Sequence, residues 1–315
     1  MNFWDAHGCF PINRDSDLSE LALYHEVGVR FLSINIGMDF NSIDLILDTV
    51  AQMRKVFRDR DDVDLVKDYQ SVEDIQKQNK IALAFDLEGS VMLNDNPNRV
   101  DLFYDLGVRQ MHLAYNKNNS IAGGCMDTPQ GITELGSKVI ERMNKVGMVL
   151  DLSHMGKRAT MEAMEMCQKP PVFSHSNALG LCEHPRNIDD EQAKKCAELG
   201  GVIGVNGIGK FLNGKADCAT SKICDHIDYF VQLVDDNHVG VGLDYVVDKT
   251  ELIEFIEQNP DSFKGPINKS MVLSFAGPSF WQEVDGELAQ RGYSVESISK
   301  ILGNNFKRIA KENWR

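Results

Sequence analysis

The sequence predicts an α/β protein built as a (β/α)8 barrel of the TIM type. Strand-like and helix-like segments alternate along all 315 residues with little interruption. Eight segments have the short apolar character of buried strands, which is the number that such a barrel contains. The length also fits, because these barrels commonly take roughly 250 residues or more.

The strand-like segments are separated by amphipathic helical patterns. Residues 133–146 place Leu135, Val139 and Met143 on one stripe, and residues 221–234 repeat this pattern. Asp189, with Gln192 three residues later, predicts the capping box of another helix. In chain order, the candidate strands are 3–7, 31–36, 81–87, 108–115, 147–154, 171–176, 201–206 and 238–244.

Three other stretches complete the predicted organisation, which is a single domain over residues 1–315. Residues 59–80 are rich in acids and lysine, which indicates an exposed excursion before the third strand. Residues 246–280 contain three prolines and predict a long loop, a feature that often serves a functional site. C-terminal helices are expected at about 281–313.

A doubly wound open sheet is the competing architecture. Such a sheet normally carries a glycine-rich phosphate-binding turn after its first strand. Here residues 7–11 read His-Gly-Cys-Phe-Pro, which does not match that fingerprint. The barrel is therefore favoured.

Composition excludes several classes of partner. Forty-seven acidic and 33 basic residues give a net charge of −14, which disfavours nucleic acid. No run approaches the roughly 18 apolar residues of a membrane span, and no charged leader precedes the first strand. The seven cysteines contain no CxxC pair and indicate a reducing compartment, so we expect a cytoplasmic protein without membrane contact.

Two apolar strands each end on a histidine. Residues 149–154 end on His154 and residues 171–176 contain His175, 21 positions later, with a helical stretch between them. Consecutive parallel strands joined by one helix lie side by side, so the two imidazoles should meet at the same edge. Neutral imidazole nitrogens in that arrangement suit zinc.

Other polar residues lie at the predicted carboxyl ends of strands, where barrel enzymes place their chemistry. Three histidines and two carboxylates from separate strands are typical of a metal-dependent hydrolase, and Glu88 is the natural bridge between two ions. Arg186, in the loop after the His175 strand, could hold an anionic end of a substrate. The remaining strand-end residues are His7, Glu88, Tyr115, Asn206 and Asp244.

The other five histidines are interpreted as structural. Each lies in a helix pattern, inside or at the start of a strand, or in a loop. They are His25, His112, His184, His226 and His238.

Several motifs together resemble the renal or membrane dipeptidases, zinc enzymes of the amidohydrolase-type barrel class. Beyond the two histidine strands, the resemblance covers nearly the whole chain and keeps the order of the motifs. It rests on residues 174–187, 200–206, 225–242 and 291–306.

The resemblance implies a role for each matching residue. His7, Glu88, His154 and His175 would bind one or two zinc ions, with Glu88 bridging if both are present. Asp244 would carry a proton between the nucleophilic water and the leaving amine. Arg186 would hold the terminal carboxylate of the substrate, and Asn206 is a further candidate for substrate binding.

The sequence departs from the family pattern at three places in the site, and one of them is Gly207 with Ile208, where the family commonly carries an aromatic residue that lines the substrate pocket. Where the family carries an aspartate ligand, this chain has Cys9, whose thiolate can also bind zinc. Tyr115 stands where the family carries a histidine that contacts the scissile carbonyl, and a tyrosine can still donate a hydrogen bond there.

We therefore expect a zinc-dependent hydrolase that cleaves a dipeptide or a small amide with a free carboxylate. The alternative is a divergent metal-binding barrel, with altered or lost peptidase activity, that acts on or binds another small molecule. A homodimer is compatible with either function.

Overall fold

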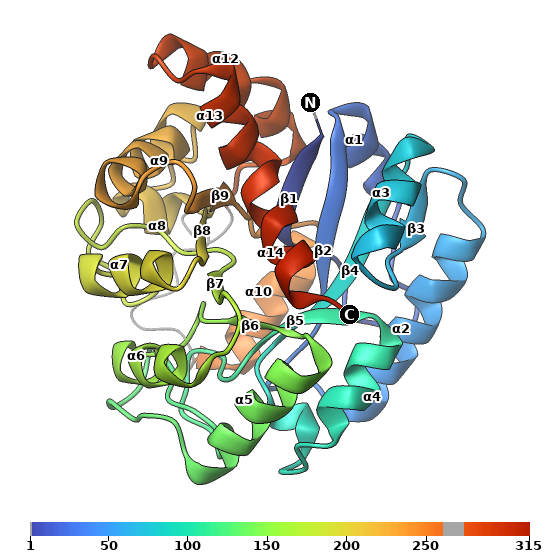
Figure 1. The fold of residues 1–315 in the computed structure, drawn as a ribbon. Coiled ribbons are helices and arrows are strands. Elements are labelled where there is room, and N and C mark those ends of the chain that lie inside the picture. Colours follow the sequence, from blue (N-terminus) through green and yellow to red (C-terminus); the bar gives the residue numbers. More distant parts are fainter. Residues whose placement is uncertain (1, 261–273) are drawn as a thin grey trace.

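The computed structural model describes residues 2–260 and 274–315, and its strands form the predicted barrel. Ten strands make one curled sheet, hydrogen-bonded in the order β10-β1-β2-β4-β5-β6-β7-β8-β9, with β3 added beside β4. The helices surround this sheet (Figure 1). The strands are β1 (Phe3–Cys9), β2 (Val29–Met38), β3 (Val63–Leu65), β4 (Ile81–Glu88), β5 (Val108–His112), β6 (Val149–Asp151), β7 (Val172–Phe173), β8 (Val202–Val205), β9 (Val239–Val241) and β10 (Tyr245–Val246).

Helices follow most of the strands, as a βα repeat requires. The predicted ends of two helices are confirmed: Thr133 caps α5 by accepting a hydrogen bond from Gly136 N, and Asp189 with Gln192 forms the capping box of α7. The described helices are α1 (Leu21–Glu26), α2 (Ile43–Arg58), α3 (Tyr69–Lys77), α4 (Arg99–Leu106), α5 (Glu134–Val146), α6 (Lys157–Met166), α7 (Asp190–Glu198), α8 (Gly209–Asn213), α9 (Thr220–Val234), α10 (Lys249–Gln258), α12 (Val284–Gln290), α13 (Val295–Ser299) and α14 (Asn305–Asn313).

The barrel closes where the chain after β9 returns to β1. Asp244 N donates to the carbonyl of His7 over 3.0 Å, and Leu243 N donates to Asp5 Oδ1 over 2.9 Å. Strand β10 then pairs in parallel with the end of β1. These contacts bring the first and last strand ends together, although more than 230 residues separate them.

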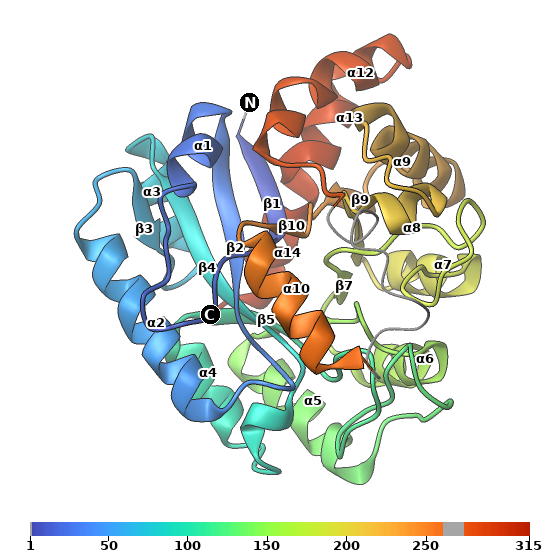
Figure 2. The ribbon, with the colours of Figure 1, turned by 180° about the vertical axis from the view of Figure 1, so that it is seen from behind.

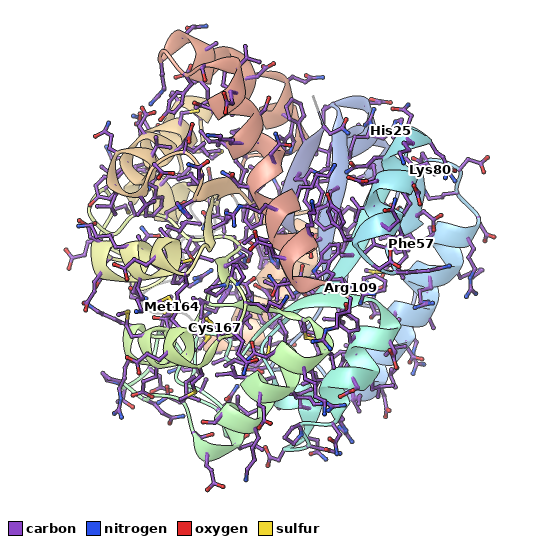
Figure 3. The ribbon with its side chains drawn as sticks, viewed as in Figure 1. His25, Phe57, Lys80, Arg109, Met164 and Cys167 are labelled. Atoms are coloured by element: carbon purple, nitrogen blue, oxygen red, sulfur yellow. The ribbon has the colours of Figure 1, made fainter. Side chains whose placement is uncertain are left out.

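The two ends of the barrel are covered differently. Helix α14 lies across one end (Figure 1), where the Phe306 ring packs under Gly204 and Gly240, which have no side chain to exclude it. Helix α10 lies across the other end, where the strands finish (Figure 2). The outer helices pack on the sheet through apolar contacts such as Phe57 of α2 on Phe85, whose ring centroids lie 5.9 Å apart. Figure 3 labels Phe57 among the side chains.

The structure corrects three sequence expectations. Residues 59–80 are not an exposed excursion, because they form β3 and α3 with Val63, Val72 and Ile75 buried. The strand expected at 171–176 shortens to β7, because the chain turns early to direct its polar residues inward. The loop expected at 246–280 contains β10, α10 and a 3-10 turn at Pro278–Gln282, while its residues 261–273 lie outside the described residues.

Among the described helices, none is both long and apolar enough to cross a membrane.

The close packing of the barrel gives a first prediction. A Cβ added at Gly204 would lie 2.0 Å from the carbonyl oxygen of Ser174, whereas one at Gly286, an exposed position of α12, meets nothing within 4 Å. Gly204→Ala should therefore lower the free energy of unfolding by about 1–3 kcal/mol. Gly286→Ala should leave it unchanged or raise it by up to about 1 kcal/mol. Denaturant unfolding measures both, and equal midpoints would contradict the packing.

Candidate metal centre and pocket

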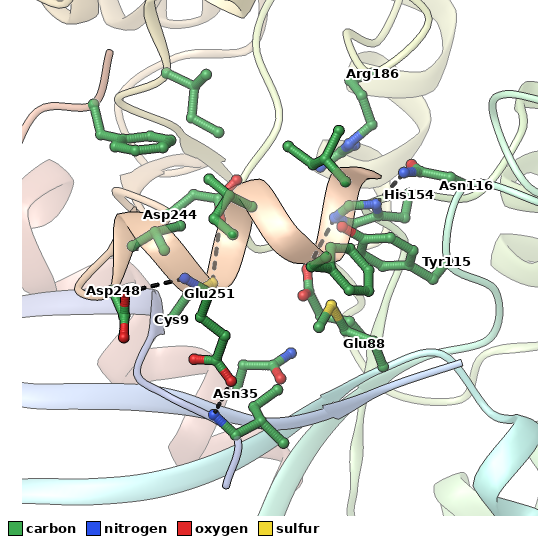
Figure 4. Close-up of a pocket in the computed structure, with 18 of the residues that line it drawn as sticks. Cys9, Asn35, Glu88, Tyr115, Asn116, His154, Arg186, Asp244, Asp248 and Glu251 are labelled. Carbon is green, nitrogen blue, oxygen red and sulfur yellow. Dashed lines mark hydrogen bonds and ion pairs between the residues drawn. The ribbon is translucent and has the colours of Figure 1, made fainter. Parts of the chain in front are cut away.

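Residues from different strands meet at the carboxyl end of the barrel, as predicted. His7 and Cys9 come from β1 and Glu88 from β4, while the others follow later strands. Most of them line one pocket under α10 (Figure 4). The predicted residues in its lining are Cys9, Glu88, Tyr115, His154, Arg186 and Asp244.

Three imidazoles converge on the carboxylate of Glu88. Its Oε1 lies 2.9 Å from His154 Nε2 and 3.4 Å from the Nε2 atoms of both His7 and His175. All four side chains are buried. The donor atoms therefore point toward one small volume that water barely reaches.

The chemistry of this donor set fits a bound cation. The Nε2 atoms of His154 and His175 lie 2.9 Å apart. Nδ1 of His154 is 2.8 Å from Asn116 Oδ1, so it carries the proton and leaves a lone pair on Nε2. A ring nitrogen lone pair beside a second imidazole nitrogen and a carboxylate oxygen is a donor arrangement that a shared metal ion would suit.

Two overlapping groups of ligand atoms share Glu88. One contains His7, Cys9 and Glu88, and the other contains Glu88, His154 and His175, each with its atoms within 4.8 Å of one another. Cys9 Sγ lies 3.4 Å from His7 Nε2 and 3.5 Å from Asp244 Oδ1. The residue that departs from the family pattern thus points into the centre.

Burial shifts the pKa values of the candidate metal ligands. It lowers the pKa values of His154 and His175 well below the usual range, with nearby cations adding to the effect, so both imidazoles are neutral. Burial also raises the pKa of Glu88 to about 7, against the opposing field of His7. The pKa of the Cys9 thiol is raised well above its usual range, mainly by burial, so the thiolate form needs a cation beside it.

Three residues of the site adopt left-handed backbone conformations that are uncommon outside glycine. The φ angles are 59° for Asn116, 66° for His154 and 56° for Asp244. Each lies in a segment that follows a strand, and all three residues line the pocket. Such conformations cost about 1–3 kcal/mol each and are concentrated at functional sites.

Sequence reasoning missed a layer of polar residues beneath the centre. Asp86 Oδ1 lies 3.2 Å from His7 Nδ1, and His112, interpreted as merely structural, pairs with Asp151 over 2.7 Å. The cluster of His112, Asp151 and His175 is itself a group of potential ligands. The available signal was a charged residue within a strand that is otherwise buried. Asp86 is such a residue, and it shares the inward face of its strand with Glu88, two positions later.

Asn206 does not reach the pocket, which corrects its predicted contact with substrate. The residue is fully buried, and its Nδ2 donates to the His175 carbonyl over 3.2 Å. Its Oδ1 accepts from Asn177 Nδ2 and from Ile208 N. The Asn206 side chain lies behind His175, and its hydrogen bond to the His175 carbonyl holds the end of β7 in place.

The other histidines are dispersed. His226 is buried in α9, with Ala178 N donating to its Nδ1 and the Leu212 carbonyl 2.8 Å from its Nε2, which supports a structural role. His25 and His238 lie beside backbone carbonyls away from the pocket. His184 does line the pocket.

The fold is a (β/α)8 barrel, and the carboxyl ends of its strands carry two groups of potential metal ligands. The family model for membrane dipeptidase (peptidase family M19) matches residues 15–257. The chain therefore belongs to the membrane dipeptidase family.

Two curated relatives share the family but are longer. A dipeptidase of Schizosaccharomyces pombe without a characterised function is 29% identical over 243 residues, covering 74% of this chain and 54% of its own length. Dipeptidase tcpJ of Claviceps purpurea is 27% identical over 277 residues, covering 87% of this chain and 59% of its own length. This chain thus matches little more than half of each relative.

Solved structures share the fold. An amidohydrolase from Pseudomonas aeruginosa superposes with a TM-score of 0.89 at 23% identity, covering 99% of this chain and 96% of that chain. A metallopeptidase from Rhodobacter sphaeroides, bound to a phosphinate mimic of the dipeptide L-Ala-D-Ala, gives 0.81 at 18% identity, covering 100% and 99%.

The converging imidazoles give a second prediction. His154→Ala and His175→Ala should each lose tight binding of at least one metal ion, because each removes a neutral nitrogen from the group around Glu88. His25→Ala, on α1, is the control and should bind as the unaltered protein does. Metal content after dialysis measures this, and unchanged stoichiometry in both site variants would contradict the assignment.

The position of Cys9 gives a third prediction. If its sulfur binds the metal, the cobalt(II)-loaded protein should show thiolate-to-cobalt charge-transfer absorption, because the metal displaces the thiol proton. Cys9→Ser should lose that absorption and weaken binding. Cys125→Ser, whose sulfur lies 3.6 Å from Asn116 Oδ1, should retain it. Identical spectra for the two variants would exclude Cys9 as a ligand.

Proposed function

We propose that this protein is a zinc-dependent hydrolase that cleaves a dipeptide, or a small amide with a free carboxylate. The observation that carries the proposal is the pair of ligand groups that share Glu88. A single carboxylate between two sets of donors is suited to a binuclear centre. Family membership supports the same class of reaction.

Five residues would hold the metal, and the metal would supply Lewis acidity and a nucleophile at neutral pH. The first ion would lie among the donors of β1 and Glu88, and the second among Glu88 and the later strand ends. The proposed ligands are His7, Cys9, Glu88, His154 and His175.

Asp244 is the proposed carrier of the proton in the reaction. Its Oδ1 lies 3.7 Å from His7 Nε2, at the edge of the donor set, and its side chain lines the pocket. Burial raises its pKa above the usual range, which favours a carboxylate able to accept a proton and return it. We propose that Asp244 takes a proton from the attacking water and delivers it to the leaving amine.

Tyr115 and Arg186 would position the substrate. The Tyr115 ring stacks on His154 with centroids 4.3 Å apart, and burial raises its hydroxyl pKa well above the usual range. The hydroxyl therefore stays protonated and can donate a hydrogen bond to the scissile carbonyl. Arg186 is buried in the lining and would hold the terminal carboxylate.

The presence of Cys9 and Tyr115 in the site favours a second candidate function, which is the binding or conversion of a different small molecule. A sulfur donor changes the softness and charge of a metal site, and a phenol is a weaker acid than an imidazolium. The barrel could then bind or transform a different small molecule while keeping its metal. A panel of dipeptides with added zinc, manganese or cobalt separates the two, because the second function predicts metal binding without hydrolysis.

A cytoplasmic location also remains part of the proposal. It is supported by the cysteines, because none of the seven is in a disulfide.

The proposed role of Asp244 gives a fourth prediction. Asp244→Asn should retain metal and lower turnover of the best dipeptide by a factor on the order of 10² or more, because the amide cannot accept the proton. Turnover and metal content are measured on the same sample, and a chelated sample gives the background. Normal turnover after metal loading would remove the proton role.

A further inference from the structure

Two cations lie on one wall of the pocket. Arg186 comes from the segment that follows β7, and Lys210 comes from α8; both line the pocket. Only Arg186 was expected from the sequence. Lys210 has no part in the function proposed above.

Neither cation has a carboxylate partner within the parts of the chain that the structure describes. Arg186 is 3% exposed, its Nη2 is 3.5 Å from the His175 carbonyl, and its Nε lacks a hydrogen bond. Lys210 is half-buried, and burial lowers its pKa below the usual range. A positive charge that loses hydration without a partner is costly, and a bound anion removes that cost.

The two cations are held close to a common set of neighbours. Asn187, next to Arg186, donates from Nδ2 to the carbonyls of Cys182 and Phe211. These hydrogen bonds connect the loop that contains Arg186 to α8. The Phe211 ring, one residue after Lys210, lies 5.7 Å from the Arg186 guanidinium carbon. These contacts thus join the two segments that carry the cations on one side of the pocket.

His184 does not add a third charge. Its ring lies 4.5 Å from that of Phe211. Burial, followed by the fields of Lys210 and Arg186, lowers its pKa to about 3, so it is neutral near pH 7. The wall therefore carries two positive charges.

The other side of the pocket has the opposite charge. Asp248 and Glu251 of α10 line it, across from Arg186 (Figure 4). An anionic group would be repelled there and attracted to the arginine and lysine wall. The charge pattern thus sets the direction in which a dianionic substrate enters.

We propose that Lys210 binds a second carboxylate of the substrate, so that the preferred substrates are dipeptides or amides whose carboxyl-terminal residue is aspartate or glutamate. This inference rests on the proposed function, in which Arg186 holds the terminal carboxylate. Lys210 then binds the side-chain carboxylate of the same residue. One carboxylate for each cation satisfies both charges.

The test compares matched acidic and amide substrates. Ala-Asp is measured against Ala-Asn, and Ala-Glu against Ala-Gln, with L and D forms of the second residue, on metal-loaded protein. The unaltered protein should favour the acidic member in kcat/KM by about tenfold to a hundredfold, the range expected of a charge-assisted contact. Lys210→Gln should bring the ratio near one, mainly through KM, and Lys210→Arg should keep the preference. Lys215→Gln, an exposed lysine in the next loop, is the charge-matched control.

A binding measurement keeps this inference separate from the proposed function. Calorimetry with succinate and glutarate, against butyrate, should show tighter dicarboxylate binding that Lys210→Gln loses and Lys215→Gln retains. Hydrolysis of neutral and acidic dipeptides at equal rates would overturn the inference and leave the hydrolase intact. If no dipeptide is cleaved, the proposed function fails, and the binding ratios alone decide whether Lys210 holds a second carboxylate.

Discussion

The convergence of three imidazole nitrogens on the Glu88 carboxylate is the constraint on which the rest of the site depends. These side chains come from three strand ends between residues 7 and 175, and their donor atoms lie 2.9–3.4 Å from one carboxylate oxygen. A cation held among them would satisfy the buried imidazole nitrogens and the carboxylate together. The barrel must therefore hold them rigidly, and its closure, its strained turns and its polar lower layer all serve that requirement.

The polar layer beneath the centre explains how the barrel holds its ligands. Asp86 contacts His7, and Asn116 contacts His154. Ser174 Oγ lies 2.7 Å from His175 Nδ1. Each contact helps to orient a ring, and the Asn116 oxygen also places the proton of His154 on Nδ1. The polar atoms are buried because the sheet curls around them, and Phe306 seals the opposite end.

Cys9 and Tyr115 show how one barrel can keep its donor geometry and change its chemistry. Cys9 occupies a position in the ligand group of β1, so the first metal would meet sulfur. Tyr115 keeps its hydroxyl protonated over the pocket because it is buried among acidic groups. Cys9 lies at the end of β1, and Tyr115 lies in the segment that follows β5. The wall formed by Arg186 and Lys210 adds selectivity on a separate set of elements.

The sequence by itself determined the fold class, the order of the strands and most of the residues at the centre. Alternation of apolar strands and amphipathic helices is a local signal, and a histidine or acid at a strand end is visible without tertiary contacts. It also singled out His154 and His175 as neighbours, because one crossover helix separates them.

Only the tertiary structure decided which polar residues share a cavity. It placed Asn206 behind His175, brought Asp86 and His112 under the centre, folded residues 59–80 into the barrel and set Lys210 on the wall with Arg186. The physical reason is that these roles depend on strand register and loop packing, which join residues distant along the chain. A pattern of neighbouring residues in the sequence does not indicate contacts between residues that are distant along the chain.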